Sequence, residues 1–490
     1  MKISTTIHIG AYVVMSGLTL PSPNSFAGSD PPPAFSAPSA GTPFPVADRF
    51  IKRIEVADVT GDGLLDIIAS DNVDVPSFRH DFHVFANNGD GTFATPVLTL
   101  VVTEGNDLFD SALTLGDLNE DGRADLVTTR LSVTTPPQGN RPNVAILFGA
   151  PDGHFVNQVN ITNSSLDVFM RSQTGRSIAL ADLNADAHLD IVSPASNAPA
   201  GNLSVLLGNG DGTFLPPIQS GSAGSHGLTE TGDIDGDGDL DVVTASDVGS
   251  NDHARTQFRV SMNDGAGNMT HVHTFELLVR ENSIDTESRL WLSDLDGDGL
   301  ADLTYYGDRG QQTGPGGLFV RRGAGDGTFS TVLFYRAFGA GGDSTFVVLN
   351  ADFDGDGDID IAKIPDPGQP GEVLVNNGAA VFTAAPLAAT STDAVCAFGD
   401  LVGSPLPDIA YYDDSYTDPR VKVATNLTPL PDRPGDIDGD GDVDFQDRDV
   451  FVAVLLGTDP DPVHTAAADL NDDNLADGRD VAPFTLALLN

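Results

Sequence analysis

The sequence predicts an all-β fold, a seven-bladed β-propeller, followed by a small all-α domain. A nine-residue string that begins and ends with aspartate recurs seven times between short β-branched runs, which is typical of a propeller built from repeats. After residue 434, two acidic loops each run into an apolar stretch of helical length. The predicted order is a signal peptide (1–27), a linker (28–39), the propeller (40–428), a second linker (429–434) and the helical domain (435–490).

The N-terminus has the pattern of a secretory signal peptide. Lys2 precedes an apolar stretch over 7–20, and Ser25-Phe26-Ala27 offers small residues for cleavage before Gly28. The alternative is an ordinary buried strand, but a proline-rich stretch follows at once. We therefore expect a secreted or cell-surface protein. No other apolar run reaches the ~20 residues of a membrane helix, so no membrane span is predicted.

The charge of the chain excludes one class of partner and suggests one kind of cofactor. The sequence holds 24 basic and 71 acidic residues, a net charge of −47. Phosphate binding needs clustered lysine and arginine, so nucleic acid is not an expected partner. The single cysteine, Cys396, allows no intramolecular disulfide. An exported chain without disulfides needs another means of stabilisation, and the acidic residues recur at fixed positions.

The aspartate strings mark one supersecondary unit each. They begin at Asp58, Asp117, Asp182, Asp233, Asp294, Asp352 and Asp400. In the first unit, alternating apolar residues precede the string, a β-branched pair follows it, and a third strand ends in a Gly-Asp-Gly-Thr-Phe turn over 89–93. A weaker fourth strand leads into the next unit. Four antiparallel strands repeated seven times predict seven blades.

The two ends of the repeat region predict how the ring closes. After the seventh string there is a third strand over 421–424 and no fourth. Before the first string, residues 40–46 look like the end of a Gly-Thr-Phe turn followed by a fourth strand. We predict that this segment completes blade seven, which removes the open sheet edges that favour aggregation.

The paired motifs over residues 40–428 resemble the FG-GAP (VCBS-type) repeat. That repeat builds the head of integrin alpha chains and occurs in many exported bacterial proteins. The resemblance implies a calcium-binding propeller used for adhesion or binding, which is sometimes attached to an enzyme.

Calcium takes six to eight oxygen ligands, and alternate positions of a tight acidic loop point inward. Positions 1, 3, 5 and 9 of each string are the expected side-chain ligands, position 7 offers a carbonyl, and glycine at position 6 permits the bend. Three sites are carboxylates throughout: Asp233, Asp235, Asp237 and Asp241; Asp294, Asp296, Asp298 and Asp302; Asp352, Asp354, Asp356 and Asp360. Three are weaker: Asp58, Thr60, Asp62 and Asp66; Asp117, Asn119, Asp121 and Asp125; Asp182, Asn184, Asp186 and Asp190.

Two strings depart from the pattern on which this prediction of about six calcium ions in the propeller rests. Ala187 replaces the bend glycine of the third string, and Val402 and Ser404 leave the seventh string without central carboxylates. The alternative is that aspartate, asparagine and glycine merely favour turns. Six strings in register favour calcium.

The C-terminal region predicts two further calcium loops, and its two loop-helix units resemble a type I dockerin, an EF-hand-like domain. The ligands would be Asp436, Asp438, Asp440, Asp444 and Asp447 in the first loop, and Asp469, Asn471, Asp473, Asp477 and Asp480 in the second. The resemblance implies a cohesin-like or other protein partner. Asn474 stands where the bend glycine belongs, and an eighth propeller repeat is the alternative.

No catalytic motif stands out in the sequence, and three functions stay open. The first is a non-catalytic adhesion module for a glycan or a surface protein. The second is a polysaccharide-degrading lyase or glycosidase, and the third is a structural component of the cell surface. In a propeller, the long loops joining strands two to three and blade to blade lie opposite the calcium hairpins. They carry much of the chain's arginine, including Arg176, Arg289 and Arg309, and this face is the predicted binding surface.

Overall fold

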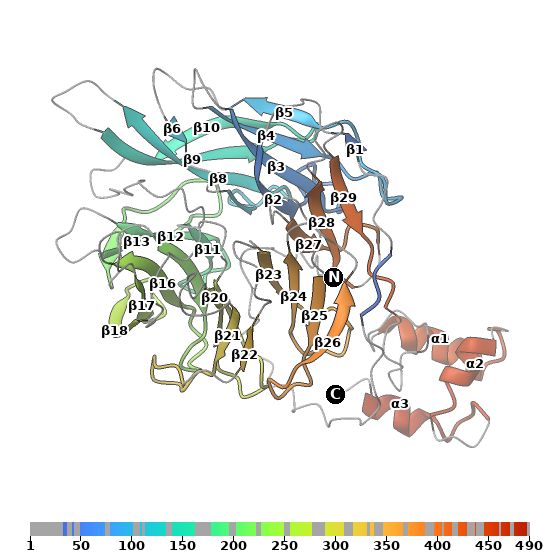
Figure 1. Cartoon of the computed structure of the whole chain (residues 1–490). Coiled ribbons are helices and arrows are strands. Elements are labelled where there is room, and N and C mark those ends of the chain that lie inside the picture. The colour runs from blue at the N-terminus through green and yellow to red at the C-terminus, as the bar shows by residue number, and fades with distance from the viewer. Residues whose placement is uncertain are drawn as a thin grey trace.

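The structure is a computed structural model that describes residues 33–36, 42–43, 50–73, 79–100, 108–109, 113–133, 140–161, 178–195, 202–221, 227–248, 255–276, 290–307, 317–330, 334–337, 346–365, 371–387, 396–403, 406–413, 420–428, 437, 445–459, 462–470 and 475–487. Its strands form seven separate antiparallel sheets, arranged as blades around a common centre (Figure 1). The predicted seven-bladed, all-β propeller is confirmed.

In five of the seven blades the four strands pair in chain order, while blade two has a fifth strand and blade seven takes its outer strand from the N-terminal segment. Blade one contains β2 (Phe50–Ala57), β3 (Asp66–Val73), β4 (Arg79–Phe85) and β5 (Val97–Leu100). Blade two contains β6 (Leu108–Phe109), β7 (Thr114–Gly116), β8 (Asp125–Val133), β9 (Asn140–Gly149) and β10 (Phe155–Ile161). Blade three contains β11 (Ala179–Ala181), β12 (Asp190–Ala195), β13 (Asn202–Leu206) and β14 (Ile218–Ser220).

The remaining blades repeat this order. Blade four contains β15 (Gly227–Gly232), β16 (Asp241–Val248), β17 (Arg255–Met262) and β18 (Thr270–Glu276). Blade five contains β19 (Leu290–Ser293), β20 (Asp302–Gly307), β21 (Gly317–Arg321) and β22 (Phe334–Ala337). Blade six contains β23 (Phe346–Ala351), β24 (Asp360–Pro365), β25 (Gly371–Val375) and β26 (Thr383–Leu387). Blade seven contains β27 (Cys396–Gly399), β28 (Asp408–Asp413), β29 (Arg420–Ala424) and β1 (Thr42–Pro43).

Blade seven is completed by the N-terminal segment. β1 pairs with β29, with Thr42 opposite Val421, so the predicted closure is confirmed. The closure also extends further than predicted, because Phe35 bridges to Asn426 and the Ser36 N–H donates to the Thr425 carbonyl at 2.8 Å. Residues 33–36, expected in a linker, therefore belong to blade seven. Phe35, and not a residue of 40–46, takes the place that Phe93 holds in blade one.

The cores lie between neighbouring blades. Ile54 and Tyr412 share one cluster between blades one and seven, and Ile68 and Leu115 share the next between blades one and two. One cluster joins three blades. The rings of Trp291 in blade five and Phe398 in blade seven lie 6.2 Å apart, and both belong to a cluster that includes Leu349 of blade six.

Three helices follow the propeller: α1 (Phe445–Leu455), α2 (Pro462–Ala467) and α3 (Val481–Ala487). They lie beside the ring (Figure 1), around a small core in which Phe451 stacks on Phe484 at 4.3 Å. Among the described residues, no helix has the length and apolarity to cross a membrane.

Candidate metal centres

The aspartate strings form the hairpins that join the first and second strands of the blades. The aspartate at position 1 folds each hairpin by accepting hydrogen bonds from backbone N–H groups further along it. In blade six, Asp352 accepts from Gly355 at 2.6 Å and from Gly357 at 2.9 Å. The bond from position 6 recurs in all six complete strings, to Asp58, Asp117, Asp182, Asp233, Asp294 and Asp352. These backbone hydrogen bonds within the string give each hairpin its tight turn.

Position 6 has a left-handed backbone in every complete hairpin. Gly63 has φ +87° and Gly238 has φ +92°, values that cost glycine little. In the third hairpin Ala187 occupies this position with φ +69°. An alanine in this region is strained by about 1–2 kcal/mol, a cost that glycine at position 6 spares the other complete hairpins.

Position 9 has a structural role that the sequence did not reveal. Asp360 accepts a hydrogen bond from the Phe353 N–H at 3.0 Å and another, on its second oxygen, from the Asn376 N–H at 2.8 Å. It thereby ties position 2 of the hairpin to the end of the third strand. The same pair of bonds occurs at all seven strings, through Asp66, Asp125, Asp190, Asp241, Asp302, Asp360 and Asp408. Asp408 keeps them although its string lacks central carboxylates, so this role does not depend on metal.

These position-9 aspartates are buried, and burial is the main reason why their pKa values are high. The pKa of Asp66 is raised to about 6, that of Asp241 to about 7 and that of Asp360 to about 8. Backbone N–H donors lower the pKa in each case, while the neighbouring carboxylates of the hairpin raise it further. A cation in the hairpin would favour the ionised form.

Three hairpins bring carboxylate oxygens together closely enough to share one ion. In each, three oxygens lie within 4.8 Å of one another. The clusters are Asp233, Asp235 and Asp241; Asp294, Asp296 and Asp302; Asp352, Asp354 and Asp356. They belong to the three strings that the sequence ranked as strongest. Within the described residues, the strings starting at Asp58, Asp117 and Asp182, which have a neutral residue at position 3, form no such cluster.

One buried oxygen supports the fit of a cation. The Thr60 hydroxyl in hairpin one is buried and makes no hydrogen bond to the described residues. It lies at position 3, where a ligand was predicted. A buried oxygen without a donor is costly unless a cation or water satisfies it. The donor set is oxygen throughout, which suits calcium and does not suit a softer metal.

Asparagine side chains join neighbouring blades beside the hairpins. The Asn376 side chain donates to the Leu295 carbonyl of blade five at 2.8 Å, and Asn426 donates to the Phe353 carbonyl of blade six at 2.8 Å. Asn87 and Asn263 make the equivalent bonds. The sequence signal was asparagine at the end of the third strand, but its partner lies 73–314 residues away and was not predicted.

The C-terminal loops are described only in part. Asp436, Asp438, Asp440, Asp444, Asn471 and Asp473 lie outside the described residues. Asp447 is buried and accepts a hydrogen bond from the Ile437 N–H at 2.6 Å, which ties the second position of the loop to its last. Asp480 accepts from the Asp477 N–H at 2.8 Å, and the Asp477 carboxylate pairs with Arg479 at 2.7 Å. No carboxylate cluster is formed by the described part of these loops.

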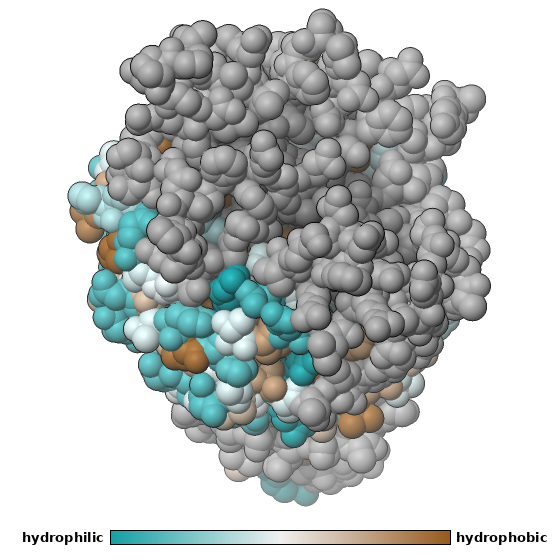
Figure 2. Space-filling view, turned by 60° about the vertical axis from the view of Figure 1, so that its left-hand side comes forward, coloured by the Kyte–Doolittle hydropathy of each residue, from teal (hydrophilic) through white to brown (hydrophobic). Residues whose placement is uncertain are grey.

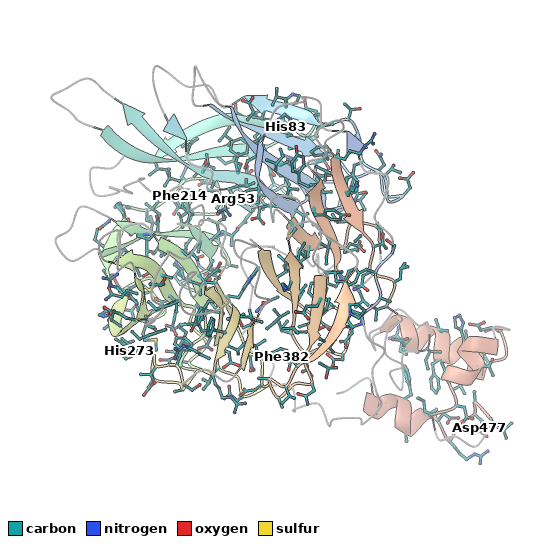
Figure 3. The ribbon with its side chains drawn as sticks, in the orientation of Figure 1. Arg53, His83, Phe214, His273, Phe382 and Asp477 are labelled. Atoms are coloured by element: carbon teal, nitrogen blue, oxygen red, sulfur yellow. The ribbon has the colours of Figure 1, made fainter. Side chains whose placement is uncertain are left out.

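Several other residues of the sequence are placed as follows. His273 lies in β18 at the outer rim of the ring (Figure 3), where its ring stacks on Phe275. Cys396 is buried between blades. Arg176, Arg289 and Arg309 lie outside the described residues, as does most of the loop face. The described part of the surface in Figure 2 is mainly hydrophilic.

Comparison with known proteins supports the repeat assignment. Residues 58–128 and 195–244 match the model of the FG-GAP-like repeat family. No curated protein matches the sequence. The chain is similar to solved structures of a rhamnogalacturonan lyase (12% identity, 81% of this chain, 76% of that chain, TM-score 0.44) and of the Bacillus licheniformis rhamnogalacturonan lyase (12% identity, 80% of this chain, 75% of that chain, TM-score 0.41). It is also similar to a mutant of NanB sialidase from Streptococcus pneumoniae (9% identity, 79% of this chain, 70% of that chain, TM-score 0.38).

Proposed function

We propose that the chain is an exported, calcium-dependent binding module without catalytic activity, whose propeller presents a glycan- or protein-binding face. The observation that carries the proposal is the set of three carboxylate clusters, each with three oxygens within 4.8 Å. They occupy the same hairpin in blades four, five and six. The same kind of site recurs in three blades, and the described residues place no reactive group beside it, which favours a role in the scaffold.

Calcium would neutralise like charges that the hairpins hold together. Asp352, Asp354 and Asp356 converge in blade six, and bound calcium supplies the positive charge that offsets their repulsion. Thr60 and Asp296 would contribute their buried oxygens in blades one and five. The Asp360 carboxylate would hold the hairpin against the third strand whether or not the ion is bound. The metal thus fixes the hairpin face, and the rigid ring positions the loops on the other face.

The C-terminal helices form a second calcium module in this proposal, related to a dockerin and used for attachment to a partner protein. The support is the pair of bonds from the loops to Asp447 and Asp480, the last residue of each predicted loop. The signal-like N-terminus supports export to the cell surface or medium.

Calorimetry and a binding screen together test the function. Chelator-stripped protein is titrated with calcium and then applied, with and without calcium, to an array of acidic polysaccharides and to intact cells. We expect several calcium sites, and calcium-dependent binding with no change in the polysaccharide. Release of unsaturated or shortened oligosaccharides would contradict the binding role and establish a lyase or glycosidase. Absence of calcium binding would contradict the metal assignment.

A further inference from the structure

One of the three carboxylate clusters contains a cation of the protein's own. In blade five the guanidinium Nε of Arg322 contacts the carboxylate of Asp296 at position 3 of the hairpin. The Asp296 side chain is only 4% exposed. The two groups form an ion pair, with the guanidinium lying directly against the carboxylate oxygen. Arg322 therefore lies at an oxygen that a calcium ion would use.

Arg322 lies at the end of the third strand of blade five, next to the residue that bonds to the hairpin. Its backbone N–H donates to the Ser330 hydroxyl at 3.1 Å, and the next residue, Gly323, donates its N–H to Asp302 at position 9. The Arg322 side chain itself is 42% exposed, so its guanidinium has a route to solvent. It can leave the carboxylate without disturbing the backbone that holds it.

The arginine is peculiar to blade five. At the same point in the other six blades, directly before the residue that bonds to the position-9 aspartate, stand Ala86, Phe148, Leu207, Met262, Val375 and Thr425. None of these carries a charge. Of the seven blades, blade five alone has a basic residue at this point of the sequence. That residue, Arg322, faces the carboxylate at position 3 of the hairpin.

We propose that Arg322 is a built-in competitor for calcium, which occupies hairpin five when calcium is scarce and lowers the calcium affinity of that hairpin. This inference rests on the calcium binding proposed above and concerns its regulation. Without calcium, the guanidinium offsets the repulsion among the aspartates. With calcium, the guanidinium moves toward solvent and the ion takes its place. Hairpin five thus stays ordered at low calcium and fills later than hairpins four and six.

Two substitutions test the inference in the full chain. Arg322→Gln removes the competing charge, and Met262→Arg places an arginine at the equivalent point of blade four. Calcium titration of chelator-stripped protein should show one site tightened about three- to fivefold by Arg322→Gln and one site weakened by Met262→Arg. In chelator, Arg322→Gln should lower the unfolding temperature, and Arg322→Lys should restore part of the loss.

The outcomes separate this inference from the proposed function. A wild-type protein that takes up no calcium would overturn both. Calcium isotherms and chelator unfolding temperatures that Arg322→Gln leaves unchanged would overturn only the role of Arg322. Circular dichroism in saturating calcium checks that each variant is folded. A tightened site in Arg322→Gln with a lowered chelator unfolding temperature is the result that supports the proposal.

Discussion

At the scale of single residues, the aspartate strings perform two tasks. They gather carboxylates, at positions 1 and 3 together with 5 or 9, and their outer positions also fold the hairpin. Position 1 closes the turn, while position 9 joins the hairpin to the third strand. Blade seven separates these tasks naturally, because Asp400 and Asp408 keep their backbone bonds around a string without central acids.

Replacing Asp408 should therefore destabilise the protein independently of metal. Its carboxylate accepts hydrogen bonds from the N–H groups of Leu401, Val402 and Asn426. Asp408→Ala would leave these buried donors without a partner, at an expected cost of about 3 kcal/mol. Urea unfolding with and without calcium should give the same loss. Asp400→Ala, at the exposed end of the same string, is the matched control and should cost less. A loss seen only with calcium would assign Asp408 to metal binding.

The backbone strain at Ala187 gives a prediction of opposite sign. Ala187→Gly should stabilise the protein by about 1 kcal/mol, because glycine accepts the left-handed φ of +69°. Gly63→Ala is the reverse change in blade one, where an added Cβ would meet nothing within 4 Å, so its cost would arise from the backbone alone. Chemical denaturation of both variants measures the effect. If Ala187→Gly lowers stability, the positive φ is not a source of strain.

The sequence could predict the residues of these hairpins but not all of their partners. A nine-residue string contains its own spacing, so the turn at Asp352 and the cluster around it follow from local chemistry. The bond from Asn376 to Asp360 spans 16 residues, and the bond from Asn426 to Phe353 crosses from one blade to another. Such partners depend on strand register and on how blades pack, which no local pattern determines.

At the scale of elements, a short N-terminal segment completes the last blade. It supplies a short strand, β1, and the residues around Phe35. Phe35 packs edge-on against Phe353 at 6.1 Å, and the Leu427 N–H donates to the Ala34 carbonyl at 2.6 Å. The sequence predicted the strand from its Gly-Thr-x-Phe remnant. It missed Phe35 because a proline-rich stretch has no periodicity to read.

Removing this segment should open blade seven. A chain that begins after Pro43 loses the pairing with β29 and the bonds to 425–428, an expected loss of about 2–4 kcal/mol. The exposed edge of β29 should also promote association. Thermal unfolding and light scattering measure the two effects. A chain that begins at Pro33 retains the segment and is the control. Equal stability of the two chains would show that closure by β1 is dispensable.

At the scale of the whole molecule, two effects reduce the repulsion among acidic groups. Burial favours the neutral form of the position-9 aspartates, and in our proposal calcium offsets the charge of the others. Six sites with dissociation constants near 10⁻⁴ M would each add about 1.4 kcal/mol at 1 mM calcium, or roughly 8 kcal/mol together. Removing calcium should therefore lower the unfolding temperature by about 10 °C or more. Scanning calorimetry in calcium and in chelator measures this. A shift of one or two degrees would mean that calcium contributes little to the ring.

The response of the calcium-free protein to pH follows from the buried aspartates. Their folded-state pKa values, about 6 for Asp66, about 7 for Asp302 and about 8 for Asp360, lie above the ordinary value of 3.8. Between about pH 4 and pH 8 the folded protein therefore binds more protons than the unfolded chain. The free energy of unfolding falls as the pH rises through this range. The calcium-free protein should melt at a higher temperature at pH 5 than at pH 8. Added calcium should reduce this difference, because the ion favours the ionised carboxylates. The opposite order in calcium-free protein would contradict the burial argument.

The bond from the Ala34 N–H to the Thr428 hydroxyl joins residues 394 positions apart, and this separation has a consequence for how the protein is made. Ribosomes add roughly 5–20 residues per second, so the first partner waits on the order of tens of seconds for the second to be synthesised. Blades one to six can assemble during that interval, but the ring cannot. A nascent chain that stops before residue 420 lacks β29 altogether, and its N-terminal segment has nothing to pair with. The ring can therefore close fully only after residue 428 has been translated.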